Sequence, residues 1–239
     1  MALIRLDHVT KRYRDRIALS DVTLSFDAGE WVWVLGPSGA GKTTLLRILA
    51  LAEKPTAGRV EVDPGAVVPG AEPAPEEPAS SPGRVSARQV RRLVGVLGQE
   101  FRLLTDRTIY DNIAIACQIS GVWSGVEIRE RVHPLLDQMG IRGREGLYPT
   151  DLSSGEKQRA ALARAMVRHP RILVADEPTG NLDPAAAAQI FALLREVRAR
   201  GTLVVVATHT EDWLRRHPGR AIRLERGIVR ADEPPKEAA

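Results

Sequence analysis

Hydrophobic and polar positions alternate in short runs over the first 35 residues. The runs 3–9, 18–26 and 31–35 are predicted to be strands, and turn residues such as Asp27-Ala-Gly separate them. Residues 42–51 contain strong helix formers and no proline. The pattern therefore predicts a strand, a glycine-rich turn and a helix in direct succession.

The same alternation of strands and helices continues to residue 230. Because strands that alternate with helices build a parallel sheet, the pattern predicts an α/β fold, and no internal repeat is visible. The predicted segments are helices at 108–139 (broken near Gly121 and Gly125), 156–168 and 184–200, strands at 172–175 and 202–207, and a hairpin at 222–230.

A chain of 239 residues fits one domain, which we place at 1–230 and follow by a flexible tail at 231–239. Prolines recur within 63–86, where there is little to bury, so we predict a disordered surface insertion there that nucleotide binding does not require. A ligand for a proline-recognising partner is the alternative interpretation of this segment.

Composition narrows the functional classes. Hydrophobic residues make up 44% and charged residues 27%, as in ordinary globular proteins, and the net charge of +4 comes from dispersed basic residues, so we expect no nucleic-acid partner. Cys117 is the only cysteine, which excludes an intrachain disulfide and predicts an inert buried thiol. The first residues lack a signal-peptide pattern and no apolar run has membrane-spanning length, which predicts a cytoplasmic protein.

A phosphate-binding loop supplies the first candidate chemistry. The string Gly36-Pro-Ser-Gly-Ala-Gly-Lys-Thr43 matches G-x-x-x-x-G-K-[ST] and lies between a predicted strand and a predicted helix. Lys42 is expected to bridge the β and γ phosphates, and Thr43 to offer its hydroxyl to Mg²⁺. Kinases, GTPases and transport ATPases all use this loop. The predicted nucleotide-binding positions are Gly36, Pro37, Ser38, Gly39, Ala40, Gly41, Lys42, Thr43 and Thr44.

Two carboxylates end the buried strand at 172–175, where an open α/β sheet binds its ligand. We expect Asp176 to hold Mg²⁺ through water. Glu177 is expected to polarise the attacking water, since phosphoryl transfer requires a group that orients the nucleophile.

The string Leu152-Ser-Ser-Gly-Glu-Lys-Gln-Arg159 resembles the L-S-G-G-[QE] signature of the ATP-binding cassette (ABC) ATPases. The resemblance implies that Ser153 and Gly155 of one subunit close over the ATP held by another, and hence a homodimer in the ATP-bound state. It also implies a P-loop NTPase (RecA-like) core with helices on both faces of a mostly parallel sheet, an antiparallel β subdomain, and a helical subdomain at about 100–155.

Further positions match those of the family, and the resemblance implies a role for each. The implied roles are adenine stacking for Tyr13, contact with Mg²⁺ and the water for Gln99, nucleotide contact for Asp183, and a place near the γ-phosphate for His209. The sequence departs from the family pattern at two positions: Ser154 replaces a signature glycine, and Gly98 stands where a bulky aromatic residue is usual. We expect hydrolysis to survive but to be slow; an ATP-binding switch that scarcely hydrolyses is the alternative.

Residues 103–115 narrow the family resemblance. The string Leu103-Leu-Thr-Asp-Arg-Thr-Ile-Tyr-Asp-Asn112 looks like that of the cell-division branch, the FtsE-type ATPases. This implies docking near 103–115 of a four-helix integral membrane subunit resembling FtsX, a peripheral position on the cytoplasmic face of the membrane, and regulation of cell-wall hydrolases. The alternatives are a lipoprotein-release or macrolide-efflux ATPase, and an ABC ATPase of nucleic-acid maintenance, for which the chain is too short.

Overall fold

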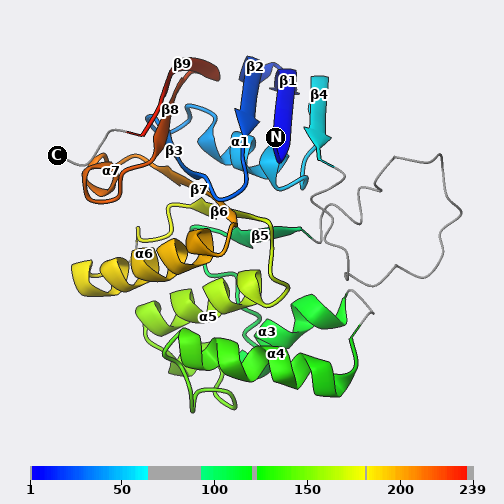
Figure 1. Cartoon of the computed structure of the whole chain (residues 1–239), viewed down its shortest axis with the longest axis vertical. Helices are drawn as coiled ribbons and strands as arrows, with labels where there is room; N and C mark the ends of the chain where they lie inside the picture. Colours follow the sequence, from blue (N-terminus) through cyan, green and yellow to red (C-terminus); the bar gives the residue numbers. More distant parts are fainter. Residues whose placement is uncertain (1, 64–92, 120–122, 181, 236–239) are drawn as a thin grey trace, which may run out of the picture.

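The computed structural model describes residues 2–63, 93–119, 123–180 and 182–235 (Figure 1). Its centre is a six-stranded sheet in the order β5-β6-β7-β3-β8-β9, in which only the β8–β9 pair is antiparallel. The mostly parallel sheet predicted from the sequence is thus confirmed. The strands are β3 (Trp31–Leu35), β5 (Val94–Leu97), β6 (Ile172–Asp176), β7 (Leu203–Thr208), β8 (Arg220–Glu225) and β9 (Ile228–Glu233).

Both faces of this sheet are covered by helices. Every residue of β3 is buried, and its side chains divide by the period of two: Trp31, Trp33 and Leu35 join the core on one face, whereas Val32 and Val34 join the core on the other. Helix α1 (Lys42–Leu49) packs on one face, and α5 (Ser154–Met166) and α6 (Pro184–Ala199) pack on the opposite face, as Figure 1 shows.

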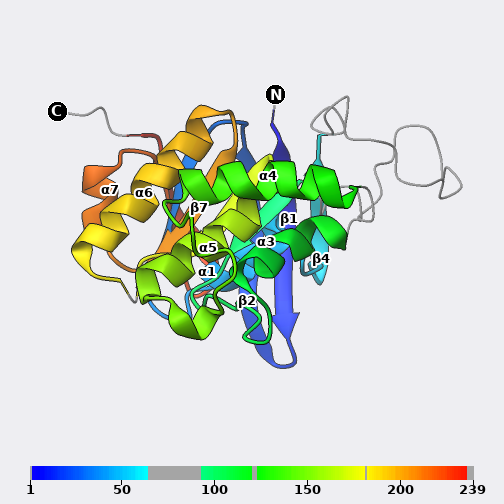
Figure 2. The same cartoon turned by 90° about the horizontal axis from the view of Figure 1, so that it is seen from below.

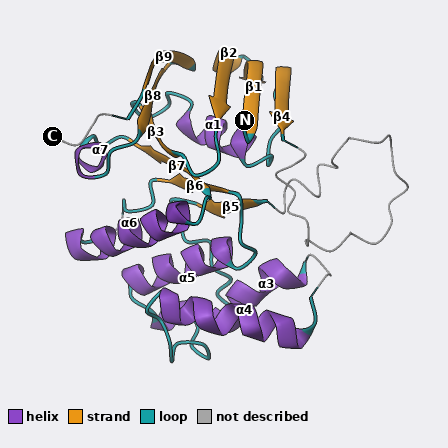
Figure 3. Ribbon diagram, viewed as in Figure 1, coloured by secondary structure: helices purple, strands orange, loops and turns teal. Residues whose placement is uncertain are grey.

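A second sheet lies beyond α1. Strands β1 (Ile4–Tyr13), β2 (Arg16–Phe26) and β4 (Ala57–Val62) pair antiparallel in the order β2-β1-β4. The helix is therefore enclosed between the two sheets (Figure 3), and its apolar side chains share one core with both. This is the predicted antiparallel β subdomain.

The helical part lies on the far side of the large sheet from α1 (Figure 1), so α3 (Ile109–Gln118), α4 (Gly125–Gln138) and α5 are in front when the molecule is seen from below (Figure 2). It contains α3, α4 and the short 3₁₀ turn η2 (Pro149–Asp151), and it packs against α5. Cys117 is buried here as expected, and burial raises the pKa of its thiol. A separate one-turn helix, α7 (Asp212–Arg216), follows β7.

Several element boundaries differ from the sequence predictions, and two of them change the picture. Helix α5 begins at Ser154 rather than at Glu156, because Ser153 and Glu156 form a capping box that starts the helix earlier. Strand β9 continues to Glu233, so the prediction of a flexible tail from 231 is wrong for residues 231–233. Backbone pairing with β8 and the ion pairs Arg220–Asp232 (2.6 Å) and Arg223–Glu233 (3.2 Å) hold these residues.

The proline-rich insertion predicted at 63–86 lies outside the described residues except for Asp63, whose backbone N–H donates to the Leu3 carbonyl at 3.0 Å. Within the described part of the chain, no helix combines the length and the apolar composition that a membrane span requires.

Candidate functional site

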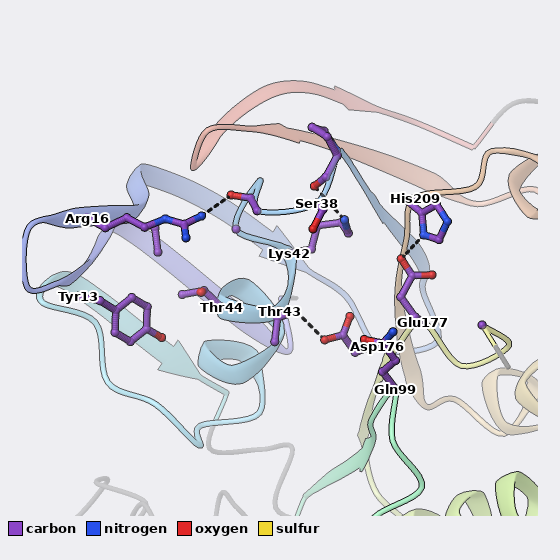
Figure 4. A pocket seen from close by; sticks show the side chains of 15 residues that line it. Tyr13, Arg16, Ser38, Lys42, Thr43, Thr44, Gln99, Asp176, Glu177 and His209 are labelled. Atoms are coloured by element: carbon purple, nitrogen blue, oxygen red, sulfur yellow. Dashed lines mark hydrogen bonds and ion pairs between the residues drawn. The ribbon is translucent and has the colours of Figure 1, made fainter.

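A cleft of about 850 Å³ opens where the carboxyl ends of β3, β5, β6 and β7 meet the start of α1 (Figure 4). This is where open α/β sheets bind ligands, and its volume suits a nucleotide-sized molecule. The cleft is lined by Tyr13, Arg16, Ala18, Pro37, Ser38, Gly39, Gly41, Lys42, Thr43, Thr44, Gln99, Asp176, Glu177, Gly180 and His209.

The loop between β3 and α1 has the shape of an anion cradle. Gly41 caps α1 with a φ of 108°, and a Cβ at this position would overlap the Ala18 carbonyl oxygen, so only glycine fits. The Lys42 side chain is 8% exposed and donates from Nζ to the carbonyls of Gly36 (2.7 Å) and Pro37 (3.1 Å). A cation and a helix N-terminus therefore face the same small volume, which favours a polyphosphate.

Thr43 and Asp176 meet on the floor of the cleft. The Thr43 hydroxyl Oγ1 donates to Asp176 Oδ2 at 2.7 Å. Mg²⁺ prefers hard oxygen ligands and is commonly held by one or two protein side chains together with substrate phosphates. A hydroxyl and a carboxylate beside a phosphate cradle are such a donor set, so these residues fit the ion.

Glu177 is held by two residues at the end of β7. Its carboxylate contacts His209 Nδ1 at 2.7 Å and accepts a hydrogen bond from Thr208 Oγ1 at 3.1 Å, as the close-up shows for His209 (Figure 4). The Glu177 backbone has a φ of 46°, in the left-handed region, and its N–H donates to the Ala207 carbonyl. Such backbone strain in a non-glycine residue is common at functional sites, and here it aims the carboxylate into the cleft.

An aromatic side chain, that of Tyr13, lines the end of the cleft away from Glu177 and His209. Tyr13 closes β1, its side chain is 37% exposed, and its hydroxyl donates to Glu53, which also forms an ion pair with Lys11 (3.0 Å). Burial alone would raise the pKa of Glu53, but the hydrogen bonds from Tyr13 and Lys11 outweigh it and hold the pKa below its ordinary value. The ring is thus anchored at its edge while remaining accessible to a planar ligand.

Three of the predicted site residues lie on a different surface. Ser153, Gly155 and Asp183 line a second hollow, which shares no lining residue with the cleft. Ser153 Oγ accepts from the Glu156 N–H at 3.3 Å and starts α5, and Asp183 accepts from the N–H groups of Ala185 and Ala186 and starts α6. Within one chain, therefore, the signature segment does not reach the phosphate loop.

Arg16, a charged residue that lines the cleft and could contact a ligand, was not identified from the sequence. Its Nη2 donates to the Gly39 carbonyl at 3.0 Å, and no motif singles it out. Two predicted loop positions do not line the cleft: Ala40 is buried, and Gly36 lines a neighbouring hollow with His209.

The family model for ABC transporters matches residues 19–180. The chain is 39% identical to the cell division ATP-binding protein FtsE of Mycobacterium tuberculosis, over 97% of this chain and 96% of that protein. It is equally 39% identical to FtsE of Escherichia coli K12, over 94% of this chain and 96% of that protein. Among solved structures, a dimeric ATP-binding cassette in a post-hydrolysis state with ADP and Pi superposes with a TM-score of 0.80 at 32% identity, covering 97% of this chain and 98% of that one. The chain is therefore an ATPase of the ABC transporter family, and it is similar to FtsE proteins over nearly its whole length.

Proposed function

We propose that this chain is the ATP-hydrolysing subunit of an FtsEX-like complex, in which closure of an ATP-bound dimer acts on a membrane partner that regulates cell-wall hydrolysis during cell division. The observation that carries the proposal is the division of the site into two halves. The cleft and the signature hollow are separate surfaces of one chain, and a nucleotide in the first would need the second from another copy.

Binding of ATP begins at the phosphate loop. The Lys42 ammonium exchanges its bonds to the Gly36 and Pro37 carbonyls for the β and γ phosphate oxygens, and the loop amides take the remaining charge. Mg²⁺ would be held by the Thr43 hydroxyl and, through water, by Asp176, where it would neutralise charge on the phosphates. Tyr13 presents its ring face to adenine.

Hydrolysis follows from the placement of Glu177. Its carboxylate orients a water and accepts one of its protons as the water oxygen attacks the γ phosphorus and the bond to the β-phosphate oxygen breaks. His209, in contact with Glu177 at 2.7 Å, fixes the direction of that carboxylate, and because it lines the same cleft it would contact the γ-phosphate. Gln99 lines the same cleft and would contact the water.

Closure requires a second copy of the chain. Ser153 and Gly155 stand at the start of α5, where helix N–H groups favour an anion, and Asp183 borders the same hollow. A phosphate held in the cleft of one subunit would complete the anion site of the other, so ATP favours the homodimer.

The membrane partner is proposed to dock near residues 103–115. In this segment Leu104 is exposed, and Asn112 is fully buried and folds the loop by bonding to the backbone of Leu104, Arg107 and Thr108. A preformed loop with an exposed apolar side chain suits a helical partner. Through this contact the chain would lie on the cytoplasmic face of the membrane.

The test compares the native chain with Glu177→Gln. Steady-state phosphate release should fall by about 10²- to 10⁴-fold, the typical contribution of a general base, while ATP binding persists. The same variant, used to capture partners from detergent-solubilised membranes, should retain an FtsX-like subunit. Equal rates of phosphate release in the two proteins would exclude the hydrolytic role of Glu177, and capture of a lipoprotein-release or drug-export permease alone would overturn the assignment to cell division.

A further inference from the structure

Arg164, in the last turn of the signature helix α5, is bonded to the loop that follows Gln99. Its Nη1 donates to the Arg102 carbonyl at 2.7 Å, and its Nη2 donates to the Phe101 carbonyl at 2.9 Å. Both acceptors are backbone groups on consecutive residues, so one guanidinium binds two adjacent carbonyls of the loop. These bonds join segments that are more than sixty positions apart in the chain.

Ion pairing does not account for the presence of a charged residue at position 164. Among the described residues, no carboxylate forms an ion pair with it, and burial lowers the pKa of its guanidinium. A partly buried cation without a counterion is costly, and an apolar side chain would fill the same space without that cost. The planar fork of arginine does, however, match two adjacent acceptors, a geometry that the single ammonium of lysine does not reproduce.

The backbone around Arg164 is also fixed against the strand that precedes the loop. A Cβ on Gly95, in β5, would lie 2.5 Å from the carbonyl oxygen of Ala165, so only glycine allows α5 to approach β5 this closely. Arg102, whose carbonyl receives the shorter bond, has a φ of 46°. Gln99 lies between these two anchors, at the edge of the nucleotide cleft.

We propose that Arg164 is a positioning residue for hydrolysis, which fixes the 99–102 loop and with it Gln99 relative to the helix that carries Ser153 and Gly155. The inference rests on the proposed function and extends it. The guanidinium is a rigid connection between two half-sites. One is the loop with Gln99, beside the γ-phosphate bound by its own chain; the other is α5, whose Ser153 and Gly155 meet the phosphate bound by a second copy. Loss of the connection leaves the phosphate loop intact, so it lowers turnover rather than nucleotide affinity.

The test uses two variants that break the connection from opposite ends. Arg164→Lys keeps the charge and removes the fork. Arg102→Pro forces φ to about −65°, which turns the Arg102 carbonyl away without changing α5. Arg102→Gly is its matched control, since glycine adopts a φ of 46° readily and removes the same side chain. Arg198→Lys controls for the loss of an arginine-to-carbonyl bond elsewhere, because Arg198 Nε donates to Gly29 at 3.0 Å.

Steady-state kcat, the ATP dissociation constant, the melting temperature and amide exchange over residues 99–104 are measured on the full chain. We expect kcat to fall about 10- to 100-fold in Arg164→Lys and Arg102→Pro, as for other misplacements remote from the chemistry. The dissociation constant should stay within about twofold, and exchange over 99–104 should accelerate without nucleotide. Arg102→Gly and Arg198→Lys should resemble the native chain.

Two results would overturn the inference. One is an unchanged kcat and unchanged exchange in both connecting variants; the other is a parallel loss of kcat, nucleotide affinity and melting temperature, which would assign Arg164 to general stability. If Arg164→Lys does not fold, Arg102→Pro decides the matter alone by the same criteria. A native chain that binds ATP without hydrolysing it would instead contradict the proposed function, and the exchange measurement would still report on the connection.

Discussion

The hydroxyl of Thr43 and the carboxylate of Asp176 lie 2.7 Å apart although 133 positions separate them in the sequence. Thr43 belongs to the first turn of α1 and Asp176 ends β6, and both are carried to one edge by the parallel sheet. Their contact marks the place where the metal ion of a nucleotide complex would sit.

We predict that Asp176→Asn removes most of the effect of Mg²⁺ on ATP binding. The neutral amide keeps the shape of the side chain but loses the negative charge. The factor by which Mg²⁺ raises the affinity for ATP should therefore be about 10- to 100-fold smaller than in the native chain. Titration calorimetry with Mg²⁺ and with EDTA measures the difference. Affinity in EDTA should be unchanged, and a variant that retains the full Mg²⁺ effect would remove Asp176 from the metal site.

His209 is predicted to act through Glu177. His209→Ala should lower kcat at least about tenfold, and adding it to Glu177→Gln should cost little more, because residues that work as one unit are not additive. Phosphate release from the two single variants and the double variant tests this. His133→Ala, at an exposed position on α4, is the control and should hydrolyse ATP normally. Independent, multiplicative losses would show that the 2.7 Å contact has no part in the reaction.

Asn112 is predicted to stabilise the folded state. It is fully buried and its amide bonds to four backbone groups, so Asn112→Ala leaves several polar groups buried without partners and should cost about 2 to 3 kcal/mol. Urea unfolding measures the change. Gln138→Ala, which removes an exposed amide bond to Glu196, should change stability by less than about 0.5 kcal/mol. Similar values for both variants would contradict the buried network.

Glu156 is predicted to make the start of α5 sensitive to acid. Its carboxylate accepts from the Ser153 N–H (2.9 Å) and from Arg144 Nε (3.0 Å), and the backbone hydrogen bond of Ser153 is the main reason why the pKa of Glu156 lies below its ordinary value of 4.5. The stabilisation is complete above the unfolded pKa and is lost as the pH falls through the lower folded pKa.

Unfolding free energies from pH 7 to pH 3 test this acid dependence. Glu156→Gln keeps an acceptor oxygen but cannot ionise, so it should be less stable than the native chain by about 1 kcal/mol at pH 7, and the difference should shrink towards zero at pH 3. A difference that does not change with pH would show that the charge of Glu156 is irrelevant to the fold.

The sequence by itself determined the features that are local in the chain. The phosphate loop was predictable because its glycines, Lys42 and Thr43 are contiguous, and their conformation follows from φ freedom and the adjoining helix start. The cap at Ser153 is local in the same way, although the capping box that begins α5 at Ser154 was overlooked. The alternation of strands and helices likewise predicted the α/β class, since periodicity depends only on near neighbours.

Only the tertiary structure decided which distant residues meet. The hydrogen bonds from Arg164 to the 99–102 loop and from Arg16 to Gly39 join segments whose spacing carries no periodic signal. The fold also decided that Ser153 and Gly155 line a hollow separate from the cleft of their own chain. The physical reason is that sheet order and helix packing, rather than sequence separation, bring charges and hydrogen-bonding groups together.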